Sequence, residues 1–325
     1  MLKRPRRNRK NPVVRAFARE TTLSADNFIY PLFIHRGKDK EPIASMPGCF
    51  RLDPENLLRE AEAALEDGVR SIVLFPKVED ELKAKDGHES YNSEGLVQTS
   101  LRALKSRFPE LLLITDVALD PYSSDGHDGV VAEDGRILND ETVDILVKQA
   151  VSQAEAGADV IAPSDMMDGR VEAIRDALEE KNHGDVSILS YTAKYASAFY
   201  GPFRDALDSA PKSGDKKTYQ MDPANWREAI REAELDEAEG ADMLMVKPAG
   251  PYLDVIRTVR EVTALPIAAY QVSGEYAMIK AGGQLGWIDE QRVALESLLA
   301  IRRAGASIIL TYYARQAARW LRAGG

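Results

Sequence analysis

The chain has 325 residues, of which 44% are hydrophobic, and its 42 Lys and Arg against 52 Asp and Glu give a net charge of −10. This length is sufficient for one large α/β domain or two ordinary ones, with a core that needs no disulfides or structural metal. The negative charge argues against nucleic acid or an anionic membrane as the main partner. We therefore expect a soluble, globular protein.

Cysteine content and hydropathy limit the environment of the protein. The only cysteine, Cys49, excludes disulfide frameworks and cysteine-based zinc sites within the chain. The N-terminus lacks the apolar core of a signal peptide, and no apolar run approaches the ~20 residues that span a bilayer. These features predict a reducing, cytoplasmic location.

The opening segment MLKRPRRNRK, residues 1–10, is strongly basic. It is compatible with a nucleic-acid tail or a targeting signal, but a solvated arm, or an arm that lies on a neighbouring subunit, is the favoured interpretation.

Apolar runs and amphipathic segments alternate along the rest of the chain. Glycines at 68, 157, 240 and 305 end four charge-rich segments and precede β-rich runs, a pattern typical of helix-to-strand junctions. Helices are predicted over 54–68, 140–157, 169–181 and 225–240. Eight buried strands are predicted in chain order, at 28–34, within 66–75, at 111–117, within 155–164, at 186–192, within 238–247, at 266–272 and within 303–312.

This alternation predicts a (β/α)₈ TIM barrel. A doubly wound open sheet is the alternative, but no Gly-x-Gly-x-x-Gly turn follows a strand. Active sites of barrels lie where strands end, and reactive side chains occur at these positions: Asp116, Ser164, Asp165, Lys194, Lys247, Ser273, Tyr312 and Tyr313. Long insertions at 76–93, 118–138 and 195–222 follow the second, third and fifth strands and are candidates for lids or binding loops.

Two lysines stand out among these residues. Alternation within DMLMVK directs Lys247 toward the barrel interior, and Lys194 follows the adjacent strand two residues after Thr192. Two neighbouring, partly desolvated ammonium groups disfavour each other's charge, so the pKa of at least one should fall below ~10.4. A neutral lysine attacks carbonyls, which indicates a Schiff-base lyase. Solvated surface lysines remain the alternative.

Four segments, SILSYTAKYASAFYGPFR, TYQMDPANWREA, MLMVKPAGPYLD and AYQVSGEYAMI, resemble signature segments of the porphobilinogen synthase (δ-aminolevulinic acid dehydratase) family. The resemblance extends from about residue 12 to the C-terminus. It implies a barrel (25–325) with a lid near 195–222 and an extended N-terminal arm (1–24) that contacts other subunits. The implied reaction condenses two molecules of 5-aminolevulinate to porphobilinogen with loss of two waters, through Schiff bases on Lys194 and Lys247.

The resemblance also implies the residues that bind substrate. Arg204 and Lys216 match ligands of one substrate carboxylate, and Ser273 with Tyr312 match those of the other, in keeping with the need of a carboxylate for strong donors. Another Schiff-base lyase and an inactive scaffold barrel are the alternatives. The two lysines and the four predicted carboxylate ligands are all present, which argues against an inactive scaffold.

The loop DVALDPYSSDGHDG, residues 116–129, departs from the zinc-dependent family pattern. Ala118, Asp120 and Asp128 stand where those members carry cysteines, so no zinc is expected. The aspartates, with Asp125, are candidates for a hard-cation site, for hydrogen bonds to the substrate amino group, or for a polar turn; the second role is favoured for Asp120 and Asp128. His127 is interpreted as a loop residue.

Members with an aspartate-rich loop are often stimulated by Mg²⁺ bound near a subunit interface, away from the catalytic centre. The matching residue is Glu232, on a helix with many exposed acids, and a magnesium ion held mostly by water needs few protein ligands. The family also implies a homo-octamer assembled through the arm. No nucleic-acid or membrane partner is expected.

Overall fold

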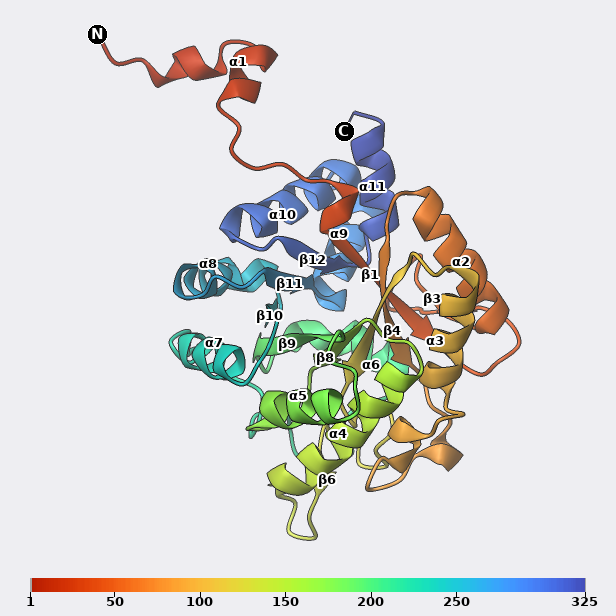
Figure 1. The fold of residues 1–325 in the computed structure, drawn as a ribbon. Coiled ribbons are helices and arrows are strands. Elements are labelled where there is room, and N and C mark those ends of the chain that lie inside the picture. Colours follow the sequence, from red (N-terminus) through yellow and green to blue (C-terminus); the bar gives the residue numbers. More distant parts are fainter. Residues whose placement is uncertain (1, 325) are drawn as a thin grey trace.

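Eight parallel strands form a closed barrel in the computed structural model, which describes residues 2–324 (Figure 1). Each strand pairs with its neighbours in chain order, and the last pairs with the first through Phe28 opposite Ile309, so the sheet has no free edge. The strands are β1 (Phe28–Ile34), β4 (Ser71–Pro76), β5 (Leu112–Val117), β8 (Val160–Pro163), β9 (Ser187–Lys194), β10 (Met243–Lys247), β11 (Ile267–Gln271) and β12 (Ile308–Thr311).

Helices surround the barrel and separate successive strands (Figure 1). Residues of both layers join one continuous core, because the strands are almost wholly buried on both faces. The helices of this outer layer are α2 (Pro54–Glu66), α3 (Leu96–Arg107), α4 (Asn139–Glu155), α5 (Arg170–Glu180), α7 (Glu228–Ala238), α8 (Leu253–Val262), α9 (Ser273–Gln284), α10 (Glu290–Ala304) and α11 (Ala314–Arg322), whereas the short α6 (Gly201–Leu207) lies over the strand ends. No helix among residues 2–324 is long and apolar enough to cross a membrane.

The predicted barrel and all eight predicted strands are confirmed. The predicted helices correspond to α2, α4, α5 and α7. The strand boundaries differ by one or two residues, and one difference concerns the site: the sequence places Lys194 just past its strand, but it is the last residue of β9. The strand extends this far because an irregularity in its pairing with β10 lets the ladder continue to Lys194, which lies opposite Lys247.

The helix-to-strand junctions depend on glycine where the chain reverses direction. Gly157 has φ +105° and Gly240 has φ +99°, a region that residues with a Cβ atom rarely enter. A Cβ atom on residue 240 would also lie 3.0 Å from Cγ of Arg175. These glycines therefore let each helix end close to the next strand.

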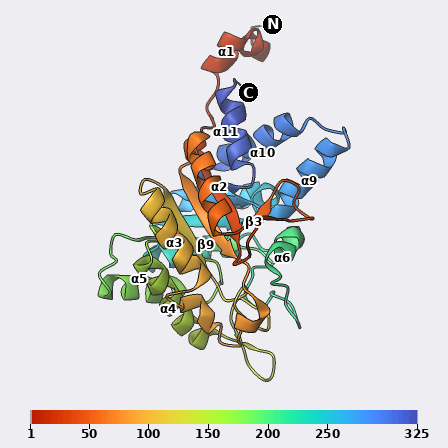
Figure 2. The same cartoon turned by 90° about the vertical axis from the view of Figure 1, so that its right-hand side faces the viewer.

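Two pairs of short strands and an N-terminal segment lie outside the eight-stranded barrel. β3 (Phe50–Leu52) pairs with the end of β1 and with β2 (Glu41–Pro42), and β6 (Val130–Val131) pairs with β7 (Ile137–Leu138). The N-terminal segment contains the 3₁₀ helix η1 (Pro5–Arg9) and α1 (Pro12–Phe17), and projects away from the barrel in both views (Figures 1 and 2). Its apolar side chains are exposed, with Phe17 at 85% and Val13 at 62%.

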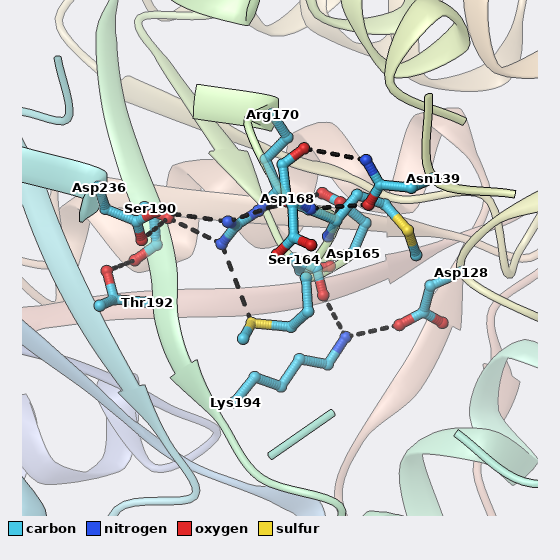
Figure 3. Close-up of polar contacts among 12 residues, drawn as sticks. Asp128, Asn139, Ser164, Asp165, Asp168, Arg170, Ser190, Thr192, Lys194 and Asp236 are labelled. Carbon is cyan, nitrogen blue, oxygen red and sulfur yellow. Dashed lines mark hydrogen bonds and ion pairs between the residues drawn. The ribbon is translucent and has the colours of Figure 1, made fainter. Parts of the chain in front are cut away.

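A buried polar network joins α5, β9 and α7 behind the strand that carries Lys194 (Figure 3). Arg170 Nη1 lies 3.3 Å from Asp236 Oδ1, and Arg170 Nη2 donates to Ser190 Oγ at 3.1 Å. The Ser190 hydroxyl donates to the second oxygen of Asp236 at 2.7 Å. Since Arg170 and Asp236 are 2% and 1% exposed, their charges stabilise each other without solvent.

Replacing Asp236 by Ala should destabilise the barrel strongly, because Arg170 would keep a buried charge without its main partner. We expect the free energy of unfolding in urea to fall by about 3–5 kcal/mol. Glu234→Ala, an exposed change on the same helix, should alter it by less than about 0.5 kcal/mol. Equal free energies of unfolding for the two variants would show that the network does not stabilise the barrel.

Candidate active site

Lys194 and Lys247 lie side by side at the end of the barrel where strands finish. They close β9 and β10, are direct partners in the strand register, and are each 6% exposed. The structure therefore brings together the two lysines that sequence spacing singled out. Their side chains have different surroundings, and this difference determines their chemistry.

The Lys247 ammonium group is enclosed by aromatic rings. Its Nζ lies between 4.7 and 5.2 Å from the ring centroids of Tyr191, Tyr200, Phe203 and Tyr270. It forms no ion pair within residues 2–324. Burial, reinforced by the positive charge of Lys194, lowers the pKa of Lys247 to about 7. A substantial fraction of this amine is therefore neutral near pH 7, the form that attacks a carbonyl.

Lys194, by contrast, contacts close hydrogen-bond acceptors. Its Nζ donates to Asp128 Oδ2 at 2.8 Å and to the carbonyl oxygen of Ser164 (Figure 3). Lys216 contacts the other oxygen of Asp128 and lies 3.5 Å from Asp120 Oδ2. Although burial alone would raise it, the two ammonium groups hold the pKa of Asp128 well below its usual range.

Asp116, near the end of β5, is a carboxyl group that interacts with both Schiff-base candidates. Burial raises the pKa of Asp116 to about 7, against the opposing effect of the Lys247 and Lys194 charges. A carboxyl group and an amine that titrate in the same range are suited to exchange protons with a bound ketone. Asp116 therefore supplies a candidate acid and base beside Lys247.

Ser273 and Tyr312 lie on the Lys247 side of the site. Tyr312 follows β12, and its hydroxyl is 2.8 Å from that of Tyr270, which contacts Lys247. Ser273, the first residue of α9, accepts a hydrogen bond from the backbone N–H of Phe203 at 3.0 Å. The residues that sequence resemblance assigned to one carboxylate thus border the aromatic enclosure of Lys247.

Arg204 and Lys216 belong to the segment predicted as a lid, 195–222, which contains α6 and covers the site. Lys216 is buried between Asp120 and Asp128, whose charges raise its pKa although burial would lower it. Arg204 is half-buried, and its guanidinium takes part in no ion pair with any other residue in the range 2–324. Arg204 therefore remains available to bind an anion.

His127 and Asp125 attach this segment to the loop after β5. His127 Nε2 lies 2.9 Å from the carbonyl oxygen of Ser213, and Nδ1 lies 3.0 Å from the Tyr219 hydroxyl. The Asp125 carbonyl accepts from Lys212 N at 3.1 Å. His127 was interpreted only as a loop residue; the structure shows that it links the two loops over the site.

Several residues of the site were not identified from sequence. The aromatic enclosure comes from β9, β11 and the lid segment, so its members are scattered along the chain. The density of aromatic residues in SYTAKYASAFYGPF, around Lys194, was an available signal. Tyr219 and the buried Glu275 gave no comparable signal.

Glu232 lies on α7, at a separate cavity of about 540 Å³ that also borders Asp134, Asp168 and Glu228. Burial raises the pKa of Glu232 to about 7; Arg170 opposes this rise, and the carboxylates of Asp236 and Glu228 reinforce it. Among residues 2–324, no three Asp, Glu, His or Cys side chains are grouped closely enough to hold a metal alone. The cavity therefore gathers carboxylates that repel one another.

Comparison with known proteins agrees with this geometry. The family model described as delta-aminolevulinic acid dehydratase matches residues 2–320. The chloroplastic delta-aminolevulinic acid dehydratase of Physcomitrium patens is 65% identical over 99% of this chain and 74% of its own length. Dehydratase 1 of Arabidopsis thaliana, also chloroplastic, is 64% identical over 99% of this chain and 75% of its own length.

A solved structure gives the same result. The delta-aminolevulinic acid dehydratase (porphobilinogen synthase) of Toxoplasma gondii, in complex with its reaction product porphobilinogen, superposes with a TM-score of 0.98. It is 57% identical and covers 98% of this chain and 92% of its own.

The relatives' names also correct the expected cytoplasmic location. Relatives at 63–65% identity are named chloroplastic, which contradicts that expectation. The expectation relied on a low cysteine content, which indicates a reducing compartment but does not distinguish one such compartment from another.

The match extends over nearly the whole chain in sequence and in structure. The chain belongs to the delta-aminolevulinic acid dehydratase family, the porphobilinogen synthases.

Proposed function

We propose that Lys247 and Lys194 carry the two Schiff bases through which this porphobilinogen synthase joins two molecules of 5-aminolevulinate. The supporting observation is the register of β9 and β10, which places the two amines opposite each other. One of them, Lys247, has a pKa lowered to about 7 by burial. Two ketones bound to these lysines are held close together in a fixed orientation. Two free molecules in solution seldom meet in that orientation, so binding favours their condensation.

The chemistry begins with the neutral amine of Lys247. Its lone pair attacks the ketone carbon, the carbonyl oxygen leaves as water after two protonations, and a C=N bond to Nζ remains. Asp116 supplies and recovers protons at this centre. Lys194 enters the same sequence after giving up one proton, for which Asp128 is the nearest carboxylate. Two waters leave in the overall condensation.

Each lysine has its own set of carboxylate-binding residues. Ser273 and Tyr312 border Lys247, whereas Lys216 shares Asp128 with Lys194, and Arg204 adds a second positive charge. We assign one substrate carboxylate to each set. Charge-assisted bonds from Lys216 and Arg204 would replace the ion pairs that Lys216 forms with the aspartates.

Asp120 and Asp128 are proposed to bind the substrate amino group. Both are buried carboxylates beside the second lysine, and an ammonium group is the counterpart they already accept from Lys216. No zinc is proposed, since carboxylates here stand in place of thiolates.

Magnesium is assigned a regulatory site at Glu232. When bound, the cation would neutralise the carboxylates around the cavity of α7, and Glu232 would hold it with water as the other ligand. The cavity also borders Tyr219 and Met221 at the end of the lid segment. Glu232 therefore lines the same cavity as the end of the lid segment.

The exposed arm is proposed to assemble the enzyme into a homo-octamer. Residues 1–24 carry eight basic residues and one acidic residue, although the whole chain has a net charge of −10. A basic arm with exposed Phe17 and Val13 complements the acidic surface of a second copy.

Trapping with borohydride tests the Schiff base. With 5-aminolevulinate we expect a stable adduct on Lys247, located by peptide mass spectrometry. Because only the neutral amine reacts, the initial trapping rate should fall about tenfold per pH unit below pH 7 and level off above it. In Lys194→Met the midpoint should move to higher pH, because the repelling charge is lost. Absence of the Lys247 adduct, or of pyrrole formation by the native protein, would contradict the mechanism.

Magnesium dependence tests the Glu232 site. Chelation should lower the rate of porphobilinogen formation without abolishing it, and Glu232→Ala should remove the stimulation by added Mg²⁺. Glu234→Ala, on the exposed side of the same helix, serves as the control and should keep that stimulation. Full stimulation in Glu232→Ala would rule out this site.

Deletion of residues 1–11 tests the arm. We expect sedimentation velocity to show assemblies smaller than those of the full chain, with a much smaller change in activity per subunit, because the arm projects away from the barrel (Figure 2). An unchanged sedimentation profile would be evidence against the role of the arm in assembly.

A further inference from the structure

Glu275 is a buried carboxyl group outside the set of residues that act on substrate. It is the third residue of α9, directly behind Ser273, and is 8% exposed. Its Oε2 accepts hydrogen bonds from the backbone N–H groups of Val272 at 2.8 Å and Ala249 at 3.4 Å. Its Oε1 accepts from the N–H of Gly250 at 2.8 Å.

These bonds connect two loops that carry different parts of the site. Ala249 and Gly250 follow Lys247 at the end of β10, whereas Val272 precedes Ser273 at the end of β11. The side chain of Glu275 therefore fixes the Lys247 loop relative to the Ser273 turn. Burial raises the pKa of Glu275 to about 7, and the three N–H donors oppose this rise by favouring the carboxylate.

Two glycines, at positions 250 and 274, allow the close backbone approaches around Glu275. A Cβ atom on residue 250 would lie 2.6 Å from Glu275 Oε1, so only glycine allows the backbone to approach the carboxylate this closely. The same turn supports the lid, because a Cβ atom on residue 274 would lie 2.5 Å from the Phe199 carbonyl oxygen.

We infer that Glu275 is a positioning residue that sets the distance between the Lys247 amine and the carboxylate-binding Ser273. This inference builds on the proposed function, in which one substrate molecule bridges Lys247 and Ser273. A keto acid that bridges these two points depends on their separation, whereas a ketone without a carboxylate depends only on the amine. The ratio of the two reactivities at Lys247 therefore reports the action of Glu275.

The experiment compares borohydride labelling of Lys247 by 4-oxopentanoate and by 2-pentanone, the same carbon chain without the carboxylate, with adducts assigned by peptide mass spectrometry. The unmodified enzyme should prefer 4-oxopentanoate. In Glu275→Gln the amide oxygen can replace only one of the two carboxylate oxygens, so either the bond from Gly250 or the bonds from Val272 and Ala249 are lost to an NH₂ group. We expect the preference to fall at least about tenfold, with labelling by 2-pentanone within about twofold of the unmodified enzyme.

Gly250→Ala disturbs the same contact from the opposite side and should lower the preference in the same way, which keeps the test valid if Glu275→Gln does not fold. Glu89→Gln is the matched control: Glu89 is another buried glutamate, 9% exposed, and its carboxylate binds Asn92 and Arg36. This control should keep the original preference.

The possible results distinguish the positioning role of Glu275 from the proposed binding of one substrate molecule between Lys247 and Ser273. An unchanged preference in both Glu275→Gln and Gly250→Ala would overturn the positioning role, as would an equal loss of labelling by both ketones, which indicates general damage to the fold. Absence of any preference for 4-oxopentanoate in the unmodified enzyme would instead contradict the proposed bridging of Lys247 and Ser273, and the inference with it.

Discussion

The chemistry of this barrel depends on two buried lysines held opposite each other at the ends of adjacent strands. Two ammonium groups cannot both be buried at low cost without partners. Lys194 meets this requirement through its contacts with Asp128 and the Ser164 carbonyl. Lys247 has aromatic rings in place of anions, and it meets the requirement by releasing its proton readily. Strand register thus produces two amines of different reactivity from the same residue type.

The loops that follow the strands supply the charged partners of the lysines and hold the lid segment. Asp128 binds Lys194 on one oxygen and Lys216 on the other, so one carboxylate joins a strand end to the lid segment. His127 and Asp125, on the same loop as Asp128, contact the lid through Ser213 and Lys212. The second half of the lid is therefore attached to the aspartate loop that holds Lys194, whereas α6 is bonded to Arg51 and Ser273.

Most of the fold followed from local patterns. Strands buried on both faces leave apolar runs, and glycines with positive φ mark the junctions, so barrel order and the positions of Lys194 and Lys247 were predictable. The aromatic enclosure was not, because Tyr191, Phe203 and Tyr270 meet only after the barrel closes. Periodicity also does not reveal which carboxylate faces which amine: the sequence identifies Asp116 as a strand-end residue, but its interaction with Lys247 is a tertiary property.

The same distinction separates reactive residues from those that support them. Reactive residues in this fold end strands, where sequence position alone indicates them. Glu275 sits within a helix, has only backbone partners, and resembles an ordinary residue of a first helical turn. Its significance arises from the chain segments that it joins, one ending in Lys247 and the other beginning with Ser273. A barrel assembles its site from separate loops, so the relative placement of neighbouring loops needs such cross-links as much as it needs the reactive groups themselves.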